Sequence, residues 1–473
     1  MIQNTRAFAF ISVLLSAVGF YFGTGLHPHW WLTWLAAIPI LVFAYQSSAR
    51  IAASAAFLAY LLGELNLWNY FRILEIPVAV RFLAFITVAL AFVAGVLLSR
   101  GFSQRGRPLF AVLALPVTWV AFEYAMSWGK NGTALNLAYS QMDCMPLLQL
   151  ASITGLWGIS FLVFFFSASI AQMIHLRKFT RNLAVPLVIV TLLVLGFGVV
   201  RWASTPEGPR VRIGLAASDQ RPLLGDETKA AALTESYSKA IDELTREGAE
   251  VIVIPEKIMT TADYRAGSFY RAIQAAAIRN SVLVVAGVDQ KGEPLKRNLA
   301  FAISPSTDLL YEKHHMVVGW EDGYQPGAST VMLPAPHSSW GIEICKDMDF
   351  PPLSRTYGKL GADLMLVPAW DFEIDDWLHG RMAVMRGVES GFAIARSAKQ
   401  GFMTISDNRG RILFERRSDP SGTAHVIGTL KLYSGQTLYA RFGDWFAWLN
   451  LAAFIALLAK LSLTVRRSSA ARP

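Results

Sequence analysis

Two long blocks of this sequence carry almost no charge, and they constrain the fold more than any other feature. Residues 1–203 and 443–465 are almost entirely apolar, whereas residues 209–435 have the composition of an ordinary globular domain. Only 16% of the 473 residues are charged, while a soluble protein of this size carries about a quarter. The sequence therefore predicts a membrane protein with one water-soluble domain inserted between membrane segments.

Eight apolar stretches divide these blocks, each long enough to cross a bilayer core, which requires roughly 17 to 25 residues. They cover residues 7–25, 29–46, 50–70, 80–99, 109–127, 147–174, 182–201 and 443–464. We therefore expect the following domains: a seven-helix membrane domain over 1–203, a soluble domain over 209–435, a C-terminal membrane helix over 443–465 and a cytoplasmic tail over 466–473.

Lysine and arginine indicate the orientation, because cytoplasmic loops of membrane proteins are enriched in both. With a cytoplasmic N-terminus, the external loops hold only Arg72, Arg81 and Lys130. The cytoplasmic loops hold the larger share: Arg6, Arg50, Arg100, Arg105, Arg107, Arg177, Lys178, Arg181, Arg466, Arg467 and Arg472. The soluble domain is thus expected outside the cytoplasm, and the net charge of +9 belongs to these loops. We expect no nucleic-acid partner.

Two acidic residues, Glu64 and Glu123, lie inside apolar stretches. A charged side chain at membrane depth is costly, so such residues are candidates for function that face the bundle interior or a cavity. The alternative is a hydrogen bond that only packs two helices together. The sequence leaves both interpretations open.

Short strands and helices alternate in the soluble domain. The expected strands cover 211–216, 251–254, 281–287, 298–304, 308–313, 329–334, 340–345, 363–367 and 392–397, and the expected helices cover 226–247, 264–280 and 376–391. This order is typical of layered sheets covered by helices.

Three of these strands end in a side chain that could take part in chemistry: Glu256, Lys313 and Cys345. Individually, each has an ordinary interpretation as a loop glutamate, a surface lysine and a core cysteine. A thiolate, however, is a nucleophile that needs a base to take its proton and a cation nearby. The three residues together supply that set.

In this order and at these spacings, the three residues resemble the nitrilase (carbon–nitrogen hydrolase) superfamily. The resemblance implies an α-β-β-α sandwich in which Glu256 is the general base, Cys345 is the nucleophile and Lys313 stabilises the tetrahedral intermediate. Residues 377–389 are similar to the helix that follows the nucleophile in that superfamily.

Taken with the membrane stretches, the whole chain resembles the apolipoprotein N-acyltransferase family, a membrane-embedded branch of the same superfamily. Residues 139–143 and 148–162 are similar to a loop and the following span of that family, and Trp119 with Glu123 matches its fifth span. Glu321 stands where the family carries a supporting glutamate on a loop over the site.

The sequence also departs from the family at several positions. Lys346 and Asp347 follow the cysteine where the family has Tyr-Glu, and we count Asp347 with Glu321 among the supporting residues. The family's Pro-Phe-Gly is replaced at 318–320, its Ser-Asn-Asp-Ala-Trp-Phe-Gly at 367–372, and its Phe-Pro-Trp at 134–136. These departures leave the identities of the acyl donor and acceptor open.

The resemblance implies an enzyme of the bacterial inner membrane with its catalytic domain on the periplasmic side. It would move an acyl chain from a phospholipid, through a thioester on Cys345, to the N-terminal amine of a diacylglyceryl-cysteine lipoprotein. Its partners would be these two substrates and membrane lipid, and we expect a monomer without a cofactor. His314-His315 is not expected to hold a metal, since ligand partners at suitable spacing are missing from the sequence.

Two other functions stay open. One is a membrane-anchored carbon–nitrogen hydrolase (amidase), in which water resolves the thioester. The other is a lipoprotein-assembly factor without catalytic activity.

The stretch 319–324 predicts a mobile element near the site. It combines two glycines with two aromatic residues, a composition suited to a hinged lid that carries Trp320 at the membrane surface. A rigid packed turn is the alternative.

Overall fold

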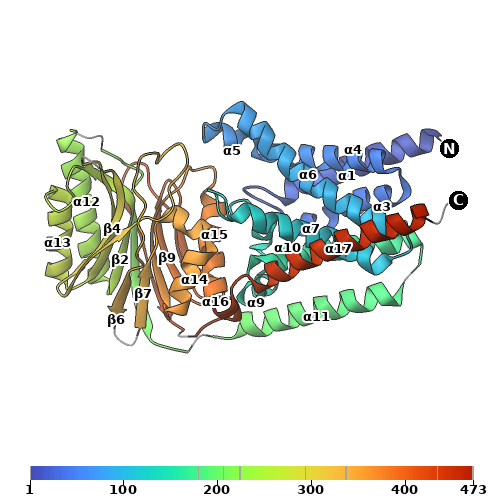
Figure 1. Ribbon diagram of the computed structural model, residues 1–473. Helices are drawn as coiled ribbons and strands as arrows, with labels where there is room; N and C mark the ends of the chain where they lie inside the picture. The colour runs from blue at the N-terminus through green and yellow to red at the C-terminus, as the bar shows by residue number, and fades with distance from the viewer. Residues whose placement is uncertain are drawn as a thin grey trace. The chain divides into compact units, whose positions relative to one another are not determined.

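The computed structural model describes residues 2–470 except 179, 206, 223–224, 293–294, 336–337 and 434, with the backbone alone for 2–5 and 464–470. The last residues of the expected tail, 471–473, lie outside this part. The chain forms two compact units (Figure 1). A helical unit comprises Met1–Gly129, Leu135–Trp202 and Asp444–Pro473, and a mixed α/β unit comprises Lys130–Ala134 and Ala203–Gly443.

Helices alone build the first unit. They are α1 (Ile2–Gly23), α2 (Trp30–Ala36), α3 (Ile38–Gln46), α4 (Ala49–Gly63), α5 (Trp68–Ile73), α6 (Val78–Ser103), α7 (Pro108–Ser127), α8 (Met145–Leu148), α9 (Ala151–Thr154), α10 (Leu156–Leu176), α11 (Arg181–Ala203) and α17 (Trp445–Ala470), with 3₁₀ turns η1 (Glu64–Leu67) and η2 (Leu137–Gln141).

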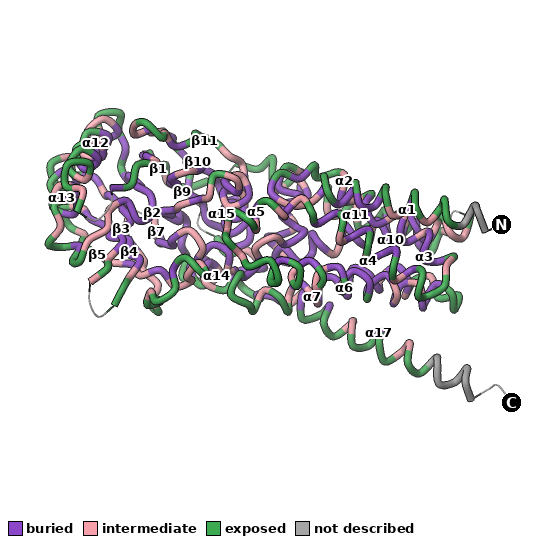
Figure 2. Tube along the Cα trace, turned by 90° about the horizontal axis from the view of Figure 1, so that it is seen from above, coloured by how far each residue is buried: buried purple, intermediate pink, exposed green. Residues whose placement is uncertain are grey.

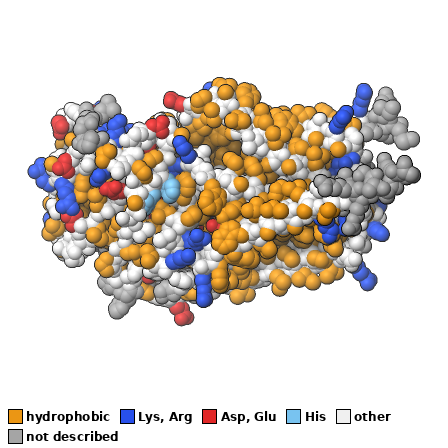
Figure 3. All heavy atoms as spheres, viewed as in Figure 1, with side chains coloured by type: hydrophobic (Ala, Val, Ile, Leu, Met, Phe, Trp, Pro, Cys, Tyr) orange, Lys and Arg blue, Asp and Glu red, His pale blue; other side chains and the backbone are white. Residues whose placement is uncertain are grey.

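Among the described residues, seven helical stretches are long and apolar enough to cross a membrane. They are Arg6–Gly23, Ala49–Ile73, Val78–Ser103, Pro108–Ser127, Leu156–Leu176, Arg181–Ala203 and Trp445–Leu463. Large apolar side chains such as Leu193, Val200 and Ile455 remain exposed on these helices. Figure 3 shows hydrophobic side chains gathered over this unit on the viewed face, the surface expected of helices that face lipid.

Among the described residues, two expected spans differ from the structure. The span expected at 29–46 is the shorter apolar stretch Trp30–Gln46, so it is not among the seven long helices, and the span expected at 147–174 begins only at Leu156. Residues 29–46 form the two short helices α2 and α3, because Pro39 lacks an N–H and begins a new helix. Residues 147–174 break before α10, since Gly155 adopts φ 66, a conformation that favours glycine.

Both acidic residues of the apolar stretches are buried. Glu64 begins η1, between α4 and α5. Glu123 lies in α7, and its Oε1 accepts a hydrogen bond from the backbone N–H of Leu137 at 2.8 Å. Glu123 therefore makes at least the packing contact that was one of its two interpretations.

Two six-stranded sheets form the framework of the α/β unit, in the strand orders β12-β1-β2-β3-β4-β5 and β11-β10-β9-β8-β7-β6. The strands are β1 (Arg210–Ala217), β2 (Val251–Thr261), β3 (Leu283–Gln290), β4 (Arg297–Ser304), β5 (Thr307–Glu312), β6 (Met332–Ala335), β7 (Ser338–Ile342), β8 (Leu364–Trp370), β9 (Ala393–Lys399), β10 (Phe402–Ser406), β11 (Ile412–Arg417) and β12 (Ala424–Lys431). The helices are α12 (Glu227–Arg246), α13 (Ser268–Asn280), α14 (Pro351–Lys359), α15 (Asp376–Ser390) and α16 (Leu438–Phe442).

The predicted α-β-β-α sandwich is confirmed. Side chains from both sheets, such as Val253 and Leu366, form one buried core between them. Helices α12 and α13 cover the outer face of the first sheet, where Leu233, Tyr237 and Leu244 of α12 are buried at helical spacing. Helices α14 and α15 pack on the outer face of the second sheet (Figures 1 and 2).

The end of the strand at 340–345 differs from the prediction. Strand β7 stops at Ile342, and Cys345 begins the 3₁₀ turn η3 (Cys345–Asp349). Helix α14, which was not predicted, begins directly afterwards with Pro351 and Pro352, because proline is tolerated in the first turn of a helix. Strands β10, β11 and β12 were not predicted.

Candidate active site

Glu256 is placed by a bulge in β2. The pairing of β2 with β3 shifts between Ile254 and Met259, and Lys257 inside the shift adopts φ 49. On β3, a Cβ added to Gly287 would lie 2.5 Å from the Cα of Glu256. The bulge, which needs a glycine opposite it, turns the buried Glu256 carboxylate out of the regular ladder.

The family resemblance implies acylation of Cys345, and we expect Gly287→Ala to slow that step by about a hundredfold, because a displacement of about 1 Å has that cost at a reactive centre. Single-turnover acylation measured by mass spectrometry would test this. Gly380→Ala is the control, since the nearest atom to its added Cβ is Thr404 Oγ1 at 3.9 Å. A normal acylation rate in folded Gly287→Ala protein would mean that the bulge does not position the carboxylate.

Lys313 directly follows β5 and is 1% exposed. Its Nζ donates to Glu256 Oε1 and to Glu321 Oε2, each at 2.8 Å. Asn298 of β4 joins the same two carboxylates, because its Nδ2 donates to Glu256 Oε1 at 2.5 Å and to Glu321 Oε1 at 2.7 Å. One lysine and one amide therefore hold two buried glutamates together.

Charge pairing outweighs burial in this cluster. Burial lowers the pKa of Lys313, but Glu256 and Glu321 raise it well above its usual value. Burial raises the pKa of Glu321, yet Lys313 and Lys257 bring it down to about 2. Lys313 and Glu321 are therefore both charged at neutral pH.

Cys345 sits at the turn with φ 45, a conformation that costs free energy in a residue other than glycine and often marks a functional site. Its Sγ donates to the backbone carbonyl of Trp370 at 3.4 Å. Burial and the Glu256 charge raise the pKa of the Cys345 thiol well above its usual value, while Lys313 opposes them. The resting thiol is thus protonated and within electrostatic reach of both groups.

Asp347 connects the turn that carries the cysteine to the segment that follows the lysine. This fully buried carboxylate accepts hydrogen bonds from the backbone N–H groups of Ile344, His314 and His315 and from the Tyr311 hydroxyl, at 2.8 to 3.1 Å. Asp347, which stands where the resemblance implies a glutamate, therefore holds the turn at Cys345 against the segment that follows Lys313.

Trp320 and Glu321 lie on the loop after Lys313. Trp320 is 47% exposed, and its ring makes an edge contact with Phe372 at 5.2 Å between centroids. Gly319 and Gly323 on either side both adopt φ 84. The structure thus brings Glu256, Lys313, Cys345 and Glu321 into one cluster and leaves Trp320 at its surface.

Three residues of the cluster were missed in the sequence. Asn298 lies on a regular strand, where nothing in the sequence marks it as part of a site. The observation that could have identified it is the pairing of β4 with β5, the strand that Lys313 follows. Lys257 Nζ lies 2.6 Å from Glu321 Oε1, and its signal was a lysine directly after the glutamate. Lys399 Nζ donates to the Lys257 carbonyl at 2.9 Å, and burial lowers the pKa of Lys399 to about 7.

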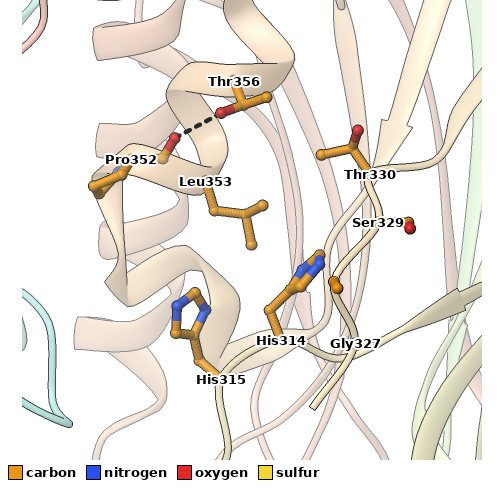
Figure 4. A pocket seen from close by; sticks show the side chains of 9 residues that line it. His314, His315, Gly327, Ser329, Thr330, Pro352, Leu353 and Thr356 are labelled. Carbon is orange, nitrogen blue, oxygen red and sulfur yellow. Dashed lines mark hydrogen bonds between the residues drawn. The ribbon is translucent and has the colours of Figure 1, made fainter.

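A separate open pocket lies beside the segment after Lys313. It is lined by His314, His315, Gly327, Ala328, Ser329, Thr330, Pro352, Leu353 and Thr356, and Figure 4 shows both histidines facing Leu353. Within the described part of the chain, no group of three or more His, Cys, Asp or Glu side chains is arranged to hold a metal ion.

Two families match this chain. Residues 12–169 match the family described as apolipoprotein N-acyltransferase N-terminal domain, and residues 215–429 match the family described as carbon-nitrogen hydrolase. An apolipoprotein N-acyltransferase of Geobacter metallireducens is 27% identical over 95% of this chain and 94% of its own length. One of Vibrio cholerae is 26% identical over 91% and 93%, respectively.

Among solved structures, an amidase from Nesterenkonia sp. covers 52% of this chain and 98% of its own, with 18% identity and a TM-score of 0.41. The resemblance inferred from the motifs is confirmed by the two family matches, which occur side by side, and by relatives that align along nearly the whole sequence. The chain belongs to the apolipoprotein N-acyltransferase family.

Proposed function

We propose that this chain transfers an acyl chain from a phospholipid to the N-terminal amine of a diacylglyceryl-cysteine lipoprotein, with Glu256, Lys313 and Cys345 as the catalytic residues. The observation that carries the proposal is the buried Lys313, whose Nζ is 2.8 Å from both Glu256 and Glu321 beside a strained cysteine. Such a cluster is costly to bury, which favours a catalytic role over a purely structural one.

In the first half-reaction, Glu256 takes the thiol proton and the Cys345 sulfur attacks the ester carbonyl of the phospholipid. From the described residues, Glu256 accepts two hydrogen bonds, both on Oε1, so Oε2 is the oxygen that takes this proton. The tetrahedral intermediate then collapses with cleavage of the ester C–O bond. The departing lysophospholipid oxygen takes the proton from Glu256, and a thioester remains on Cys345.

Lys313 stabilises the oxyanion in this step. An ammonium has three N–H donors, and the described residues engage two of them, through Glu256 and Glu321. The third is left for the developing negative charge, where a fixed donor in a buried site is most effective.

In the second half-reaction, the lipoprotein amine attacks the thioester. Glu256 takes the amine proton and returns it to the departing Cys345 sulfur, so the site is restored and an amide is formed. Both substrates carry acyl chains, and a unit of long apolar helices suits their delivery from a bilayer.

The experiment that tests this function uses purified chain in detergent. Given phospholipid alone, the peptide that contains Cys345 should gain one acyl mass that hydroxylamine removes, and a diacylated lipopeptide should then receive that acyl chain. Release of free fatty acid without transfer would favour the hydrolase. No adduct and no turnover would favour the assembly factor. Transfer is preferred because residues 12–169 match an acyltransferase domain.

We place the α/β unit on the periplasmic side of the inner membrane, because basic residues concentrate in the opposite set of loops. A reporter enzyme fused after Arg467 should then be active only in the cytoplasm. Activity of that fusion outside the cytoplasm would reverse the orientation.

We assign Trp320 to a lid that contacts lipid at the entrance to the site. Its exposed ring and the flanking glycines at φ 84 support this role. Trp320→Ala should raise KM for both lipid substrates about tenfold, because an exposed aromatic ring contributes about 1–2 kcal/mol when it is buried against an acyl chain. Unchanged KM values for phospholipid and lipopeptide would exclude the lid.

A further inference from the structure

Glu321 is held by two lysines, one on each oxygen of its carboxylate. Lys313 Nζ lies 2.8 Å from Oε2, and Lys257 Nζ lies 2.6 Å from Oε1. With Glu256, these side chains form a buried cluster of two carboxylates and two ammonium groups, in which every side chain is at most 6% exposed. The formal charges cancel only if Lys257 is counted.

The conformation of Lys257 is fixed from several sides. Its φ of 49 is unfavourable for any residue other than glycine, and such a backbone conformation persists only where the surrounding structure holds it in place. Lys399 Nζ holds its carbonyl at 2.9 Å. The Lys257 ammonium also lies 4.1 Å from the ring centroid of Tyr324, whose hydroxyl donates to Asp289.

We propose that Lys257 is a positioning residue: it neutralises Glu321, so that Lys313 stays available to the reaction. This inference rests on the proposed function. Without Lys257, Glu321 would compete for Lys313, and the cluster would carry one uncompensated negative charge. Glu256 and Lys313 of this cluster act electrostatically on the Cys345 thiol, so an uncompensated negative charge in the cluster opposes formation of the thiolate.

The charged groups around the Cys345 thiol come from several elements: Glu256 of β2, Lys313 after β5, Asp371 after β8, Arg396 of β9 and, 3.5 Å from Asp371, His379 of α15. Asp371 and Arg396 are hydrogen-bonded to each other. His379 has its own carboxylate partner in Asp375 at 3.5 Å, and although burial lowers the pKa of His379, Asp375 and Asp371 raise it to about 9. The charge that substitution of Lys257 changes is that of the glutamate–lysine cluster.

The test is the alkylation of Cys345 by iodoacetamide between pH 7 and 10, in the full chain in detergent. Cys144→Ala as background leaves Cys345 as the only cysteine. Thiolate is the reactive form, so loss of a nearby cation should move the rate profile to higher pH. At pH values below the midpoint of the rate profile, Cys345 in Lys257→Met should be alkylated about tenfold more slowly than in the wild type. A tenfold slower rate corresponds to a rise of one unit in the pKa of the thiol. Lys257→Arg should keep the wild-type profile.

A charge-matched double variant separates this role from a structural one. Lys257→Met with Glu321→Gln removes one charge of each sign, so its alkylation profile should return toward that of the wild type. Lys291→Met is the control, because Lys291 is paired with Asp289 and is 37% exposed. The proposal is overturned if Lys257→Met keeps the wild-type profile, or if the double variant stays shifted with it.

Alkylation requires no lipid substrate. If the wild type failed to transfer an acyl chain, the proposed function would fall, yet the alkylation profiles would still report whether Lys257 sets the charge at Cys345.

Discussion

Replacing Cys345 by alanine will abolish the acyl-enzyme, with acylation falling by about 10⁴-fold or more, because no other group at this position can carry the acyl chain. Cys345→Ser will be nearly as inactive. A serine hydroxyl is a much weaker nucleophile than a thiolate, and the carboxylate Glu256 is a weak base for it. The measurement is the acyl mass on the Cys345 peptide after incubation with phospholipid.

The same variants should still fold and bind lipid. Among the described residues the sulfur makes one hydrogen bond, to the Trp370 carbonyl, and the side chain packs at the edge of the core, so removing a single sulfur leaves the surrounding sandwich in place. Cys144→Ala, on the other unit, is the matched control and should retain full turnover. An acylated serine or lysine elsewhere, or normal transfer by Cys345→Ala, would assign the chemistry to a different residue.

Much of the site could be predicted because an apolar run leads up to each of its main groups. Glu256, Lys313 and Cys345 follow or close apolar runs, and such runs are a strong local signal for strands. Glu256 lies at a bulge inside β2, Lys313 directly follows β5 in the same sheet, and Cys345 begins the turn after β7 in the other sheet. The two sheets pack on each other, which brings together three residues that are distant in sequence. Glu321 and Asp347 followed from the family resemblance and lie where they fix the loops around the lysine and the cysteine.

The rest depended on features that hydrophobic pattern does not encode. The bulge at Lys257 arises from a register shift between two strands, and one sequence alone does not specify that shift. Asn298 occupies a regular strand, so only the pairing of β4 with β5 shows that its amide reaches both glutamates. The hydropathy of the second apolar stretch does not reveal that a new helix begins inside it at Pro39.

Lys313→Met is expected to have the second largest effect. Loss of a preorganised oxyanion donor costs on the order of 3 kcal/mol in the transition state, so acylation should fall by about a hundredfold to a thousandfold. The substitution also removes the cation that contacts both buried carboxylates, and Lys257 then remains paired with Glu321 while Glu256 loses its ion-pair partner. An uncompensated buried charge costs about 3–5 kcal/mol, so the free energy of unfolding should fall as well.

The double variant Glu256→Gln with Lys313→Met tells these two effects apart. It removes one charge of each sign, and the remaining pair of Lys257 and Glu321 is balanced at 2.6 Å. Its free energy of unfolding should therefore recover toward the wild type, as measured by denaturant titration of the detergent-solubilised chain. Acylation should remain at least as slow as in either single variant, because the base and the oxyanion donor are both gone. Recovery of both stability and acylation would mean that Lys313 only compensates buried charge, and Glu256 would then lose its role as the base.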